Sequence, residues 1–86
     1  MATDQFVQIV AKPTRFPDGI NIEYHSLDEN EIPTGEQSSD SRTFSWNQAK
    51  IEFKVDADHA EKCESLLREG KTAVLGNERR IIKDYY

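Results

Sequence analysis

Residues 50–70 read KIEFKVDADHAEKCESLLREG, and this stretch decides the fold that we expect the rest of the chain to adopt. Apolar and charged residues alternate strictly from residue 51 to residue 55, which predicts a strand with one apolar face. The side chains on that face would be Ile51, Phe53 and Val55. A strand of this kind needs a second element to cover its apolar face.

Residues 58–69 have the spacing and the end signals of an amphipathic helix. Asp58 is a suitable N-cap, with Glu61 completing a capping-box pattern, and Asp56 is an alternative N-cap. Gly70 follows as a residue that adopts left-handed backbone without a Cβ clash. The apolar side chains fall on one stripe, which we expect to cover the strand: Ala60, Cys63, Leu66 and Leu67.

The segments before this unit also alternate like strands. Residues 5–11 place Val7, Ile9 and Ala11 on one face, and residues 20–27 place Ile20, Ile22 and Tyr24 on one face. Residues 43–46 resume the alternation with Phe44 and Trp46. These two have the opposite parity to Ile51 and Phe53, so the sequence predicts a bulge or tight turn at residues 47–49.

Two further strand-like runs, at residues 71–75 and 78–85, flank Gly76-Asn77 and predict a C-terminal hairpin. The chain then has about five strands with one helix near residues 58–69. This order resembles that of small OB-like barrels, and an open α+β sheet explains it almost as well. We therefore expect a single α+β domain over residues 1–86, with a mostly antiparallel sheet or an OB-like barrel.

Length and composition limit the possible classes of protein. The chain has 86 residues, one cysteine and a formal net charge of −5, which fits one small domain without disulfides. No apolar run approaches the roughly 20 residues of a membrane span, and the first residues lack the features of an export signal. We expect a cytoplasmic protein that does not associate with membranes.

The negative charge is concentrated in the first half, where residues 1–47 have eight acidic and three basic side chains. Residues 28–42 lack clear periodicity and predict an acidic, mobile loop. Such a loop can dock into a basic groove on another protein, and two tyrosines at the chain end could add an anchor. The predicted partner-binding residues are Asp28, Glu29, Glu31, Glu36, Asp40, Tyr85 and Tyr86.

A nucleic-acid interface is the alternative. Basic residues in the C-terminal hairpin, together with aromatic side chains, could bind single strands by stacking and by phosphate contacts. The net charge opposes this interpretation, because phosphates would be repelled over most of the surface. The residues of this alternative site are Lys71, Arg79, Arg80, Lys83 and Trp46.

No catalytic, cofactor or metal motif is convincing. Gly70-Lys71-Thr72 has the end of a phosphate-binding loop but lacks its first glycine and a following helix. His59 and Cys63 are four residues apart on the predicted helix, but Cys63 belongs to the apolar stripe. We expect no enzyme, no catalytic or metal-binding residue and no cofactor.

The sequence thus predicts a small binding protein of the accessory, regulatory or inhibitor type. Its composition would suit a bacteriophage product that engages a host assembly. A protein partner is favoured over nucleic acid because the first half is acidic. A homodimer that pairs the edge at Ile81-Ile82 is a further hypothesis.

Overall fold

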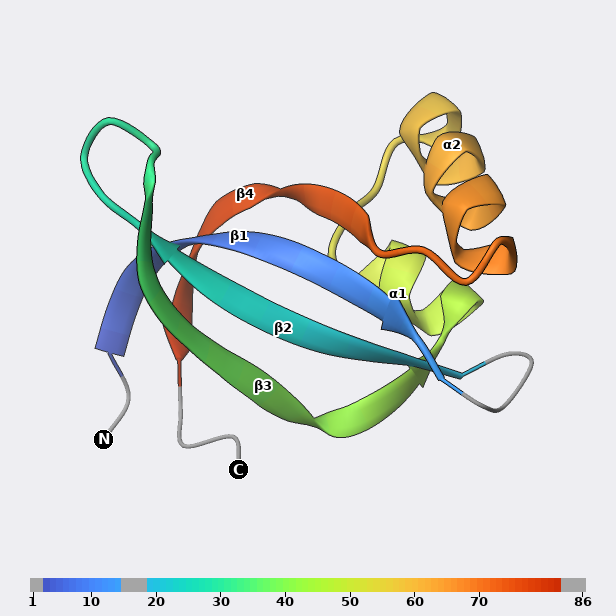
Figure 1. The fold of residues 1–86 in the computed structure, drawn as a ribbon, viewed down its shortest axis with the longest axis horizontal. Coiled ribbons are helices and arrows are strands. Elements are labelled where there is room, and N and C mark those ends of the chain that lie inside the picture. The colour runs from blue at the N-terminus through green and yellow to red at the C-terminus, as the bar shows by residue number, and fades with distance from the viewer. Residues whose placement is uncertain (1–2, 15–18, 83–86) are drawn as a thin grey trace.

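The computed structural model describes residues 3–14 and 19–82, which form a small α+β domain. The four strands of this part of the chain make one open antiparallel sheet in the order β3-β2-β1-β4 (Figure 1). Both helices lie at one end of the sheet, and the β2–β3 turn lies at the other. The elements are β1 (Thr3–Pro13), β2 (Gly19–Leu27), β3 (Pro33–Ser45), α1 (Trp46–Glu52), α2 (Ala57–Arg68) and β4 (Ala73–Ile82).

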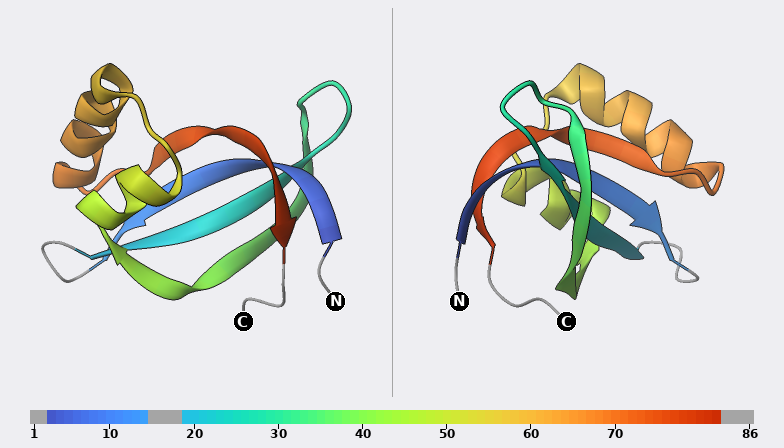
Figure 2. Two further views of the ribbon diagram at one scale, coloured as in Figure 1. Left: turned by 180° about the vertical axis from the view of Figure 1, so that it is seen from behind. Right: turned by 60° about the vertical axis from the view of Figure 1, so that its left-hand side comes forward.

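The sheet is curved, and the helices pack against one end of it (Figure 2). Strands β1 and β2 pair with Ile9 opposite Tyr24 and Ala11 opposite Ile22, so the two predicted apolar faces are one face of the sheet. This period-two prediction is confirmed, because Ile9, Ala11, Ile22 and Tyr24 are all buried in the core. Phe44 and Phe53 complete the core with edge-to-face contacts.

The prediction of a strand at residues 51–55 is wrong. The chain instead forms α1, which begins after the N-cap Ser45: the Ser45 hydroxyl accepts from the Gln48 amide, and the Gln48 side chain accepts from the Ser45 amide. This capping box satisfies amides that the helix itself leaves unpaired. Residues 47–49, where a bulge or a tight turn was expected, are therefore part of a helix. This helix leaves Ile51 80% exposed, whereas Phe53 is buried.

The capping box gives a direct test of α1. Replacing Ser45 by alanine is expected to lower the free energy of unfolding by about 1 kcal/mol, because the Gln48 amide loses its acceptor. Denaturant titration would measure the change. The matched control is Ser41→Ala at an exposed position of β3, which should leave the stability within about 0.5 kcal/mol. Equal effects of the two substitutions would contradict the capping role.

The second helix lies close to its predicted position. It begins after Asp56, the alternative N-cap, so Asp58 lies within its first turn and the predicted Asp58–Glu61 capping box is not formed. The Asp56 side chain makes no capping hydrogen bond. At the other end, Gly70 has the left-handed backbone that was predicted, with φ of 78°. The described residues therefore contain two helices where one was predicted.

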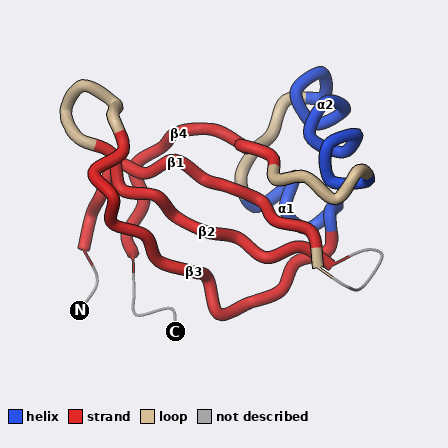
Figure 3. Tube along the Cα trace, in the orientation of Figure 1, coloured by secondary structure: helices blue, strands red, loops and turns tan. Residues whose placement is uncertain are grey.

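The predicted C-terminal hairpin is also wrong. Residues 73–82 form one strand, β4, that runs beside β1 (Figure 3). The pairing shifts from Ile9–Gly76 to Val10–Val74, which leaves Leu75 as an extra residue in β4. Gly76 therefore marks a β-bulge rather than a turn, a second setting in which glycine is favoured. The two predicted C-terminal strands are thus a single strand, which is one reason why the sheet has four strands where about five were predicted.

Most of the predicted acidic loop at residues 28–42 is strand. Only residues 28–32 form a turn, and β3 begins at Pro33. The strand pairs with β2 through its backbone, with Ser38 opposite Tyr24 and Ser39 opposite Glu23. Backbone pairing needs no apolar side chains, and β3 is an edge strand whose outward side chains face water. Because β3 is mostly polar, its sequence lacks the alternation of apolar and polar residues by which a strand is predicted.

Candidate functional site

The β2–β3 turn is held by a single carboxylate. Asp28 Oδ1 accepts hydrogen bonds from the amides of Asn30 (2.8 Å) and Ile32 (2.9 Å). The backbone adds a bond from the Asp28 amide to the Ile32 carbonyl and another from the Glu31 amide to the Asp28 carbonyl. Glu31 has a φ of 62°, a conformation rare for a residue with a Cβ. Asp28 therefore organises the turn rather than simply adding charge.

The side chains that follow Asp28 in this turn are exposed. Ile32 is 57% exposed, which is unusual for a large apolar residue, and it directly follows the exposed Glu31. The turn projects at the end of the sheet remote from both helices (Figure 1). We call this region the acidic turn surface; it consists of Asp28, Glu29, Glu31 and Ile32 of the turn together with the exposed Glu36 of β3.

A hollow of about 520 Å³ adjoins the acidic turn surface. Its apolar lining comes from Phe6 and Leu27, and three of the carboxylates line it as well. Arg79 also lines it, with its guanidinium 6.0 Å from the centre of the Phe6 ring. Residues of the two competing hypotheses thus meet here, and the carboxylates outnumber the arginine three to one. The hollow favours a cationic group over an anionic one.

Asp40 does not belong to this surface, because it is only 6% exposed. Its carboxylate accepts from the Tyr24 hydroxyl (2.8 Å), from the Arg42 amide (2.9 Å), and from Nε (3.0 Å) and Nη2 (2.8 Å) of Arg42. Burial alone raises the pKa of Asp40, but these bonds outweigh it and the pKa lies below its usual range. Burial and the bond to Asp40 raise the pKa of Tyr24. Asp40 is a structural residue that binds β3 to β2.

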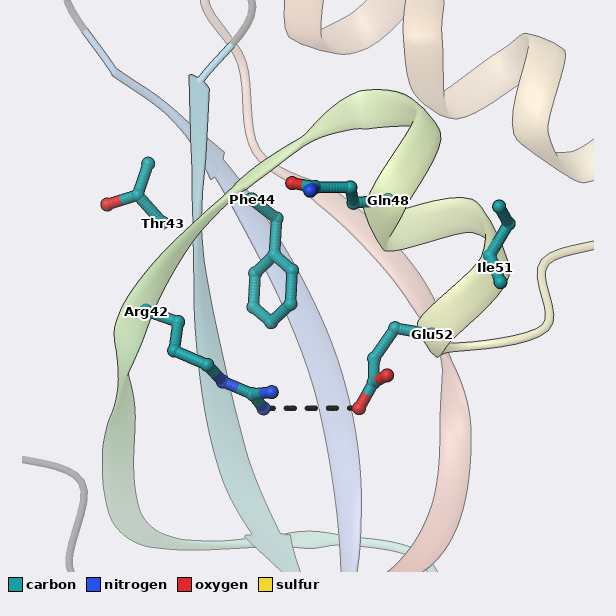
Figure 4. A pocket seen from close by; sticks show the side chains of 6 residues that line it. All are labelled: Arg42, Thr43, Phe44, Gln48, Ile51 and Glu52. Atoms are coloured by element: carbon teal, nitrogen blue, oxygen red, sulfur yellow. Dashed lines mark ion pairs between the residues drawn. The ribbon is translucent and has the colours of Figure 1, made fainter.

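The same polar cluster extends to β4 and α1. Glu52 Oε1 lies 3.9 Å from Arg42 Nη2 (Figure 4) and 3.6 Å from Arg80 Nη2. Arg80 also pairs with Glu78 and stacks over the Phe53 ring at 4.6 Å. A hollow of about 470 Å³ opens beside these side chains; its lining is Arg42, Thr43, Phe44, Gln48, Ile51 and Glu52.

The residues of the nucleic-acid alternative are dispersed. Arg80 is engaged with Glu52, Glu78 and Phe53, and Lys71 lies 3.7 Å from Glu69. Arg79 lines the acidic hollow, and Trp46 is partly buried at the start of α1. Lys83, Tyr85 and Tyr86 lie outside the described residues. The described members of this set therefore do not gather into one basic stripe.

His59 and Cys63 both contact the carbonyl of Val74, at the bulge of β4. The imidazole Nε2 donates to this oxygen at 2.8 Å, and the thiol contacts it at 3.6 Å. Cys63 is buried, and burial raises the pKa of its thiol, which opposes a nucleophilic role. Over residues 3–14 and 19–82, no group of three or more metal-ligating side chains is clustered. The pair serves to dock α2 onto β4.

Sequence patterns could have revealed part of this arrangement. Asp40 and Arg42 are two residues apart, so a strand places them on the same face. Ser45 and Gln48 match the capping box that begins α1. The first signal conflicts with the prediction of a loop at residues 28–42. The second conflicts with the prediction of a strand at residues 43–46 followed by a bulge or tight turn at residues 47–49. Nothing in the sequence indicated that Arg80 and Glu52, from distant segments, would join the cluster.

The chain was compared with protein-family models, curated proteins and solved structures, and none of the three comparisons finds a match. Neither α1 nor α2 has the length and apolar character that a membrane crossing requires. The functional argument therefore depends on the geometry of the described residues.

Proposed function

We propose that this is a non-catalytic binding protein that docks onto a basic surface of a protein partner through the acidic turn surface. The observation that supports this most strongly is the turn itself. Asp28 holds it by two side-chain hydrogen bonds, and it presents Ile32 among exposed carboxylates. An accessory, regulatory or inhibitor protein would act in this way by occupying the surface of its partner.

The acidic turn surface combines the two features that a protein interface needs. The exposed carboxylates of Glu29, Glu31 and Glu36 would steer a basic partner and set the orientation of docking. The apolar side chain of Ile32 and the hollow lined by Phe6 and Leu27 would contribute the area that loses water on binding. A lysine or arginine of the partner fits such a hollow, because its stem is apolar and its end is charged.

A protein partner is better supported than a nucleic acid. The net charge is −5, and the carboxylates outnumber the one arginine around the hollow. Arg80 already has carboxylate and aromatic partners, so binding phosphate would require it to leave them. Both observations oppose contact with a polyanion.

The test removes charge without removing the turn. The triple substitution Glu29→Gln, Glu31→Gln and Glu36→Gln leaves Asp28 in place and is expected to weaken association with the captured partner by about tenfold, because three attractive contacts are lost. The immobilised chain would first capture its partner from native extract treated with nuclease. Calorimetry with the purified partner would then give the dissociation constant.

The matched control is a triple substitution in α2 and at its C-cap: Glu61→Gln, Glu64→Gln and Glu69→Gln. It removes the same amount of charge, and none of these three side chains lines the hollow beside the acidic turn surface. It should bind like the unmodified chain. Thermal unfolding should show that the stability of both variants stays within about 0.5 kcal/mol of that of the unmodified chain.

If both variants weakened binding of the partner equally, binding would respond to net charge alone and not to the acidic turn surface. Loss of the captured material on nuclease treatment would favour the nucleic-acid alternative, which a labelled oligonucleotide and Arg79→Ala would then examine.

A further inference from the structure

Phe6 lies outside the hydrophobic core, on the outer face of β1. Val7 and Ile9 of the same strand belong to the core, so the even-numbered Phe6 points to the opposite face of the sheet. Its ring is half-buried and lines the hollow beside the acidic turn surface. Aromatic side chains that line a hollow supply contact area for a ligand.

The ring of Phe6 already has a cation beside it. In the pairing of β1 with β4, Arg79 lies directly opposite Phe6, so the two side chains share the outer face. The guanidinium carbon lies 6.0 Å from the ring centre, at the outer limit of a cation–π contact. Arg79 is exposed, and none of the ion pairs within residues 3–14 and 19–82 includes it. The guanidinium is therefore held weakly, and little opposes its displacement.

Carboxylates around the same hollow are open to a ligand as well. Glu29 and Glu31 both line it and are exposed, and neither takes part in an ion pair within the described part of the chain. A ring and carboxylates around one hollow are complementary to a guanidinium group, because this group stacks on aromatic faces and forms forked hydrogen bonds with carboxylates. The volume of the hollow, about 520 Å³, lies within the range of ligand pockets.

We propose that this hollow binds an arginine side chain of the partner, and that Arg79 limits the binding because it occupies the face of the Phe6 ring on which that side chain stacks. The inference rests on the function proposed above; it adds the type of residue that the hollow selects and a residue of the chain itself that opposes docking. Two guanidinium groups cannot stack on one ring face, and their like charges repel each other. Arg79 therefore moves away from the ring when the partner docks.

Arg79→Gln tests the opposing role, with an end-capped oligo-arginine peptide as the probe. The substitution removes the competing cation, so calorimetry should show a dissociation constant that is lower by about threefold to tenfold. Lys62→Gln is the matched control, because it removes the same charge from an exposed position of α2. It should change the dissociation constant by less than about twofold, since solvent and salt screen a distant charge. Circular dichroism would confirm that both variants fold.

Phe6→Leu tests the ring. The unmodified chain is expected to bind the arginine peptide about threefold more tightly than a lysine peptide of equal length, because a planar guanidinium stacks better than an ammonium group. Leucine keeps an apolar side chain at this position but has no aromatic face. The variant should therefore bind the two peptides equally. A preference for arginine that survives in Phe6→Leu would show that the ring does not select the ligand.

NMR titration of the unmodified chain with the arginine peptide locates the binding. The largest chemical-shift changes are expected at three residues that line the hollow, Phe6, Leu27 and Glu29. Shifts that lie elsewhere, equal effects of Arg79→Gln and Lys62→Gln, or weaker binding by Arg79→Gln would each overturn this inference. Failure of the proposed function is a different result, because it appears as unchanged binding of the captured partner by the triple glutamine variant of the acidic turn surface.

Discussion

Asp40→Ala is expected to lower the free energy of unfolding by about 2–3 kcal/mol, because the buried Tyr24 hydroxyl loses its acceptor while the half-exposed Arg42 can be hydrated instead. The substitution removes the acceptor of the Tyr24 hydroxyl, whose residue is 1% exposed, and the carboxylate that holds Arg42 by two side-chain bonds. Denaturant unfolding would measure the loss. Tyr24→Phe is the matched control: it removes one bond of the four and should cost about 1–2 kcal/mol. A cost below about 1 kcal/mol for Asp40→Ala would show that the cluster does not stabilise the sheet.

The same carboxylate makes stability depend on pH. The pKa of Asp40 is lower in the folded protein than in the unfolded chain, where aspartate titrates at about 3.9. The unfolded state therefore binds a proton first as the pH falls. The ionised Asp40 carboxylate makes its full contribution to the free energy of unfolding well above a pH of about 3.9. That contribution is lost as the pH falls from that value through the lowered pKa of Asp40 in the folded protein. The stability difference between the original chain and Asp40→Asn should accordingly narrow below about pH 4.

Phe53→Ala is expected to cost about 3–5 kcal/mol, because it removes a buried ring from the centre of the core. The ring lies edge-on to Tyr24 (6.4 Å between centroids) and Phe44 (5.6 Å), and Arg80 stacks on it. Chemical denaturation would measure the change. Its control is two residues earlier, where Ile51→Ala at an 80% exposed position should change stability by at most about 0.5 kcal/mol.

This pair of substitutions also distinguishes the helix from the strand that the alternation predicted. In a strand, Ile51 and Phe53 would share the buried face, so both alanine variants would be strongly destabilised. In the structure, Ile51 lies in the last turn of α1 and Phe53 is its C-cap, so the two side chains point in different directions, because successive helical residues are rotated by about 100°. Equal and large costs would therefore contradict the assignment of α1.

Local patterns gave reliable predictions where side-chain burial and backbone pairing agreed. Ile9, Ile22 and Tyr24 alternate with polar residues, and the sheet buries them as expected. The predictions failed where one pattern fits two structures. Five residues of alternation at 51–55 also fit a short helix followed by a buried C-cap, and a Gly-Asn pair suits a bulge as well as a turn.

For the candidate site, too, some features could be predicted from the sequence and others could not. Composition alone predicts Asp28, Glu29, Glu31 and Glu36 as site residues. The first three lie in the β2–β3 turn and line one hollow, whereas Glu36 lies in β3. Asp40 came from the same acidic run but is buried, because a strand rather than a loop follows the turn. The hollow that joins this turn to Phe6 and Arg79 could not be predicted, since it requires the pairing of β1 with both β2 and β4.

The sequence by itself determined which face of the central strands is apolar, where α2 lies and ends, and where the negative charge is concentrated. These properties depend on neighbours within a few residues, which share one element and one periodicity. Tertiary structure alone decided that residues 33–45 form a strand, that β4 continues through Gly76, and that Asp40, Tyr24, Arg42, Glu52 and Arg80 form one cluster. Each of these depends on pairing between segments far apart in the chain. The free energy of that pairing depends on both segments together, so the local pattern of one segment does not predict it.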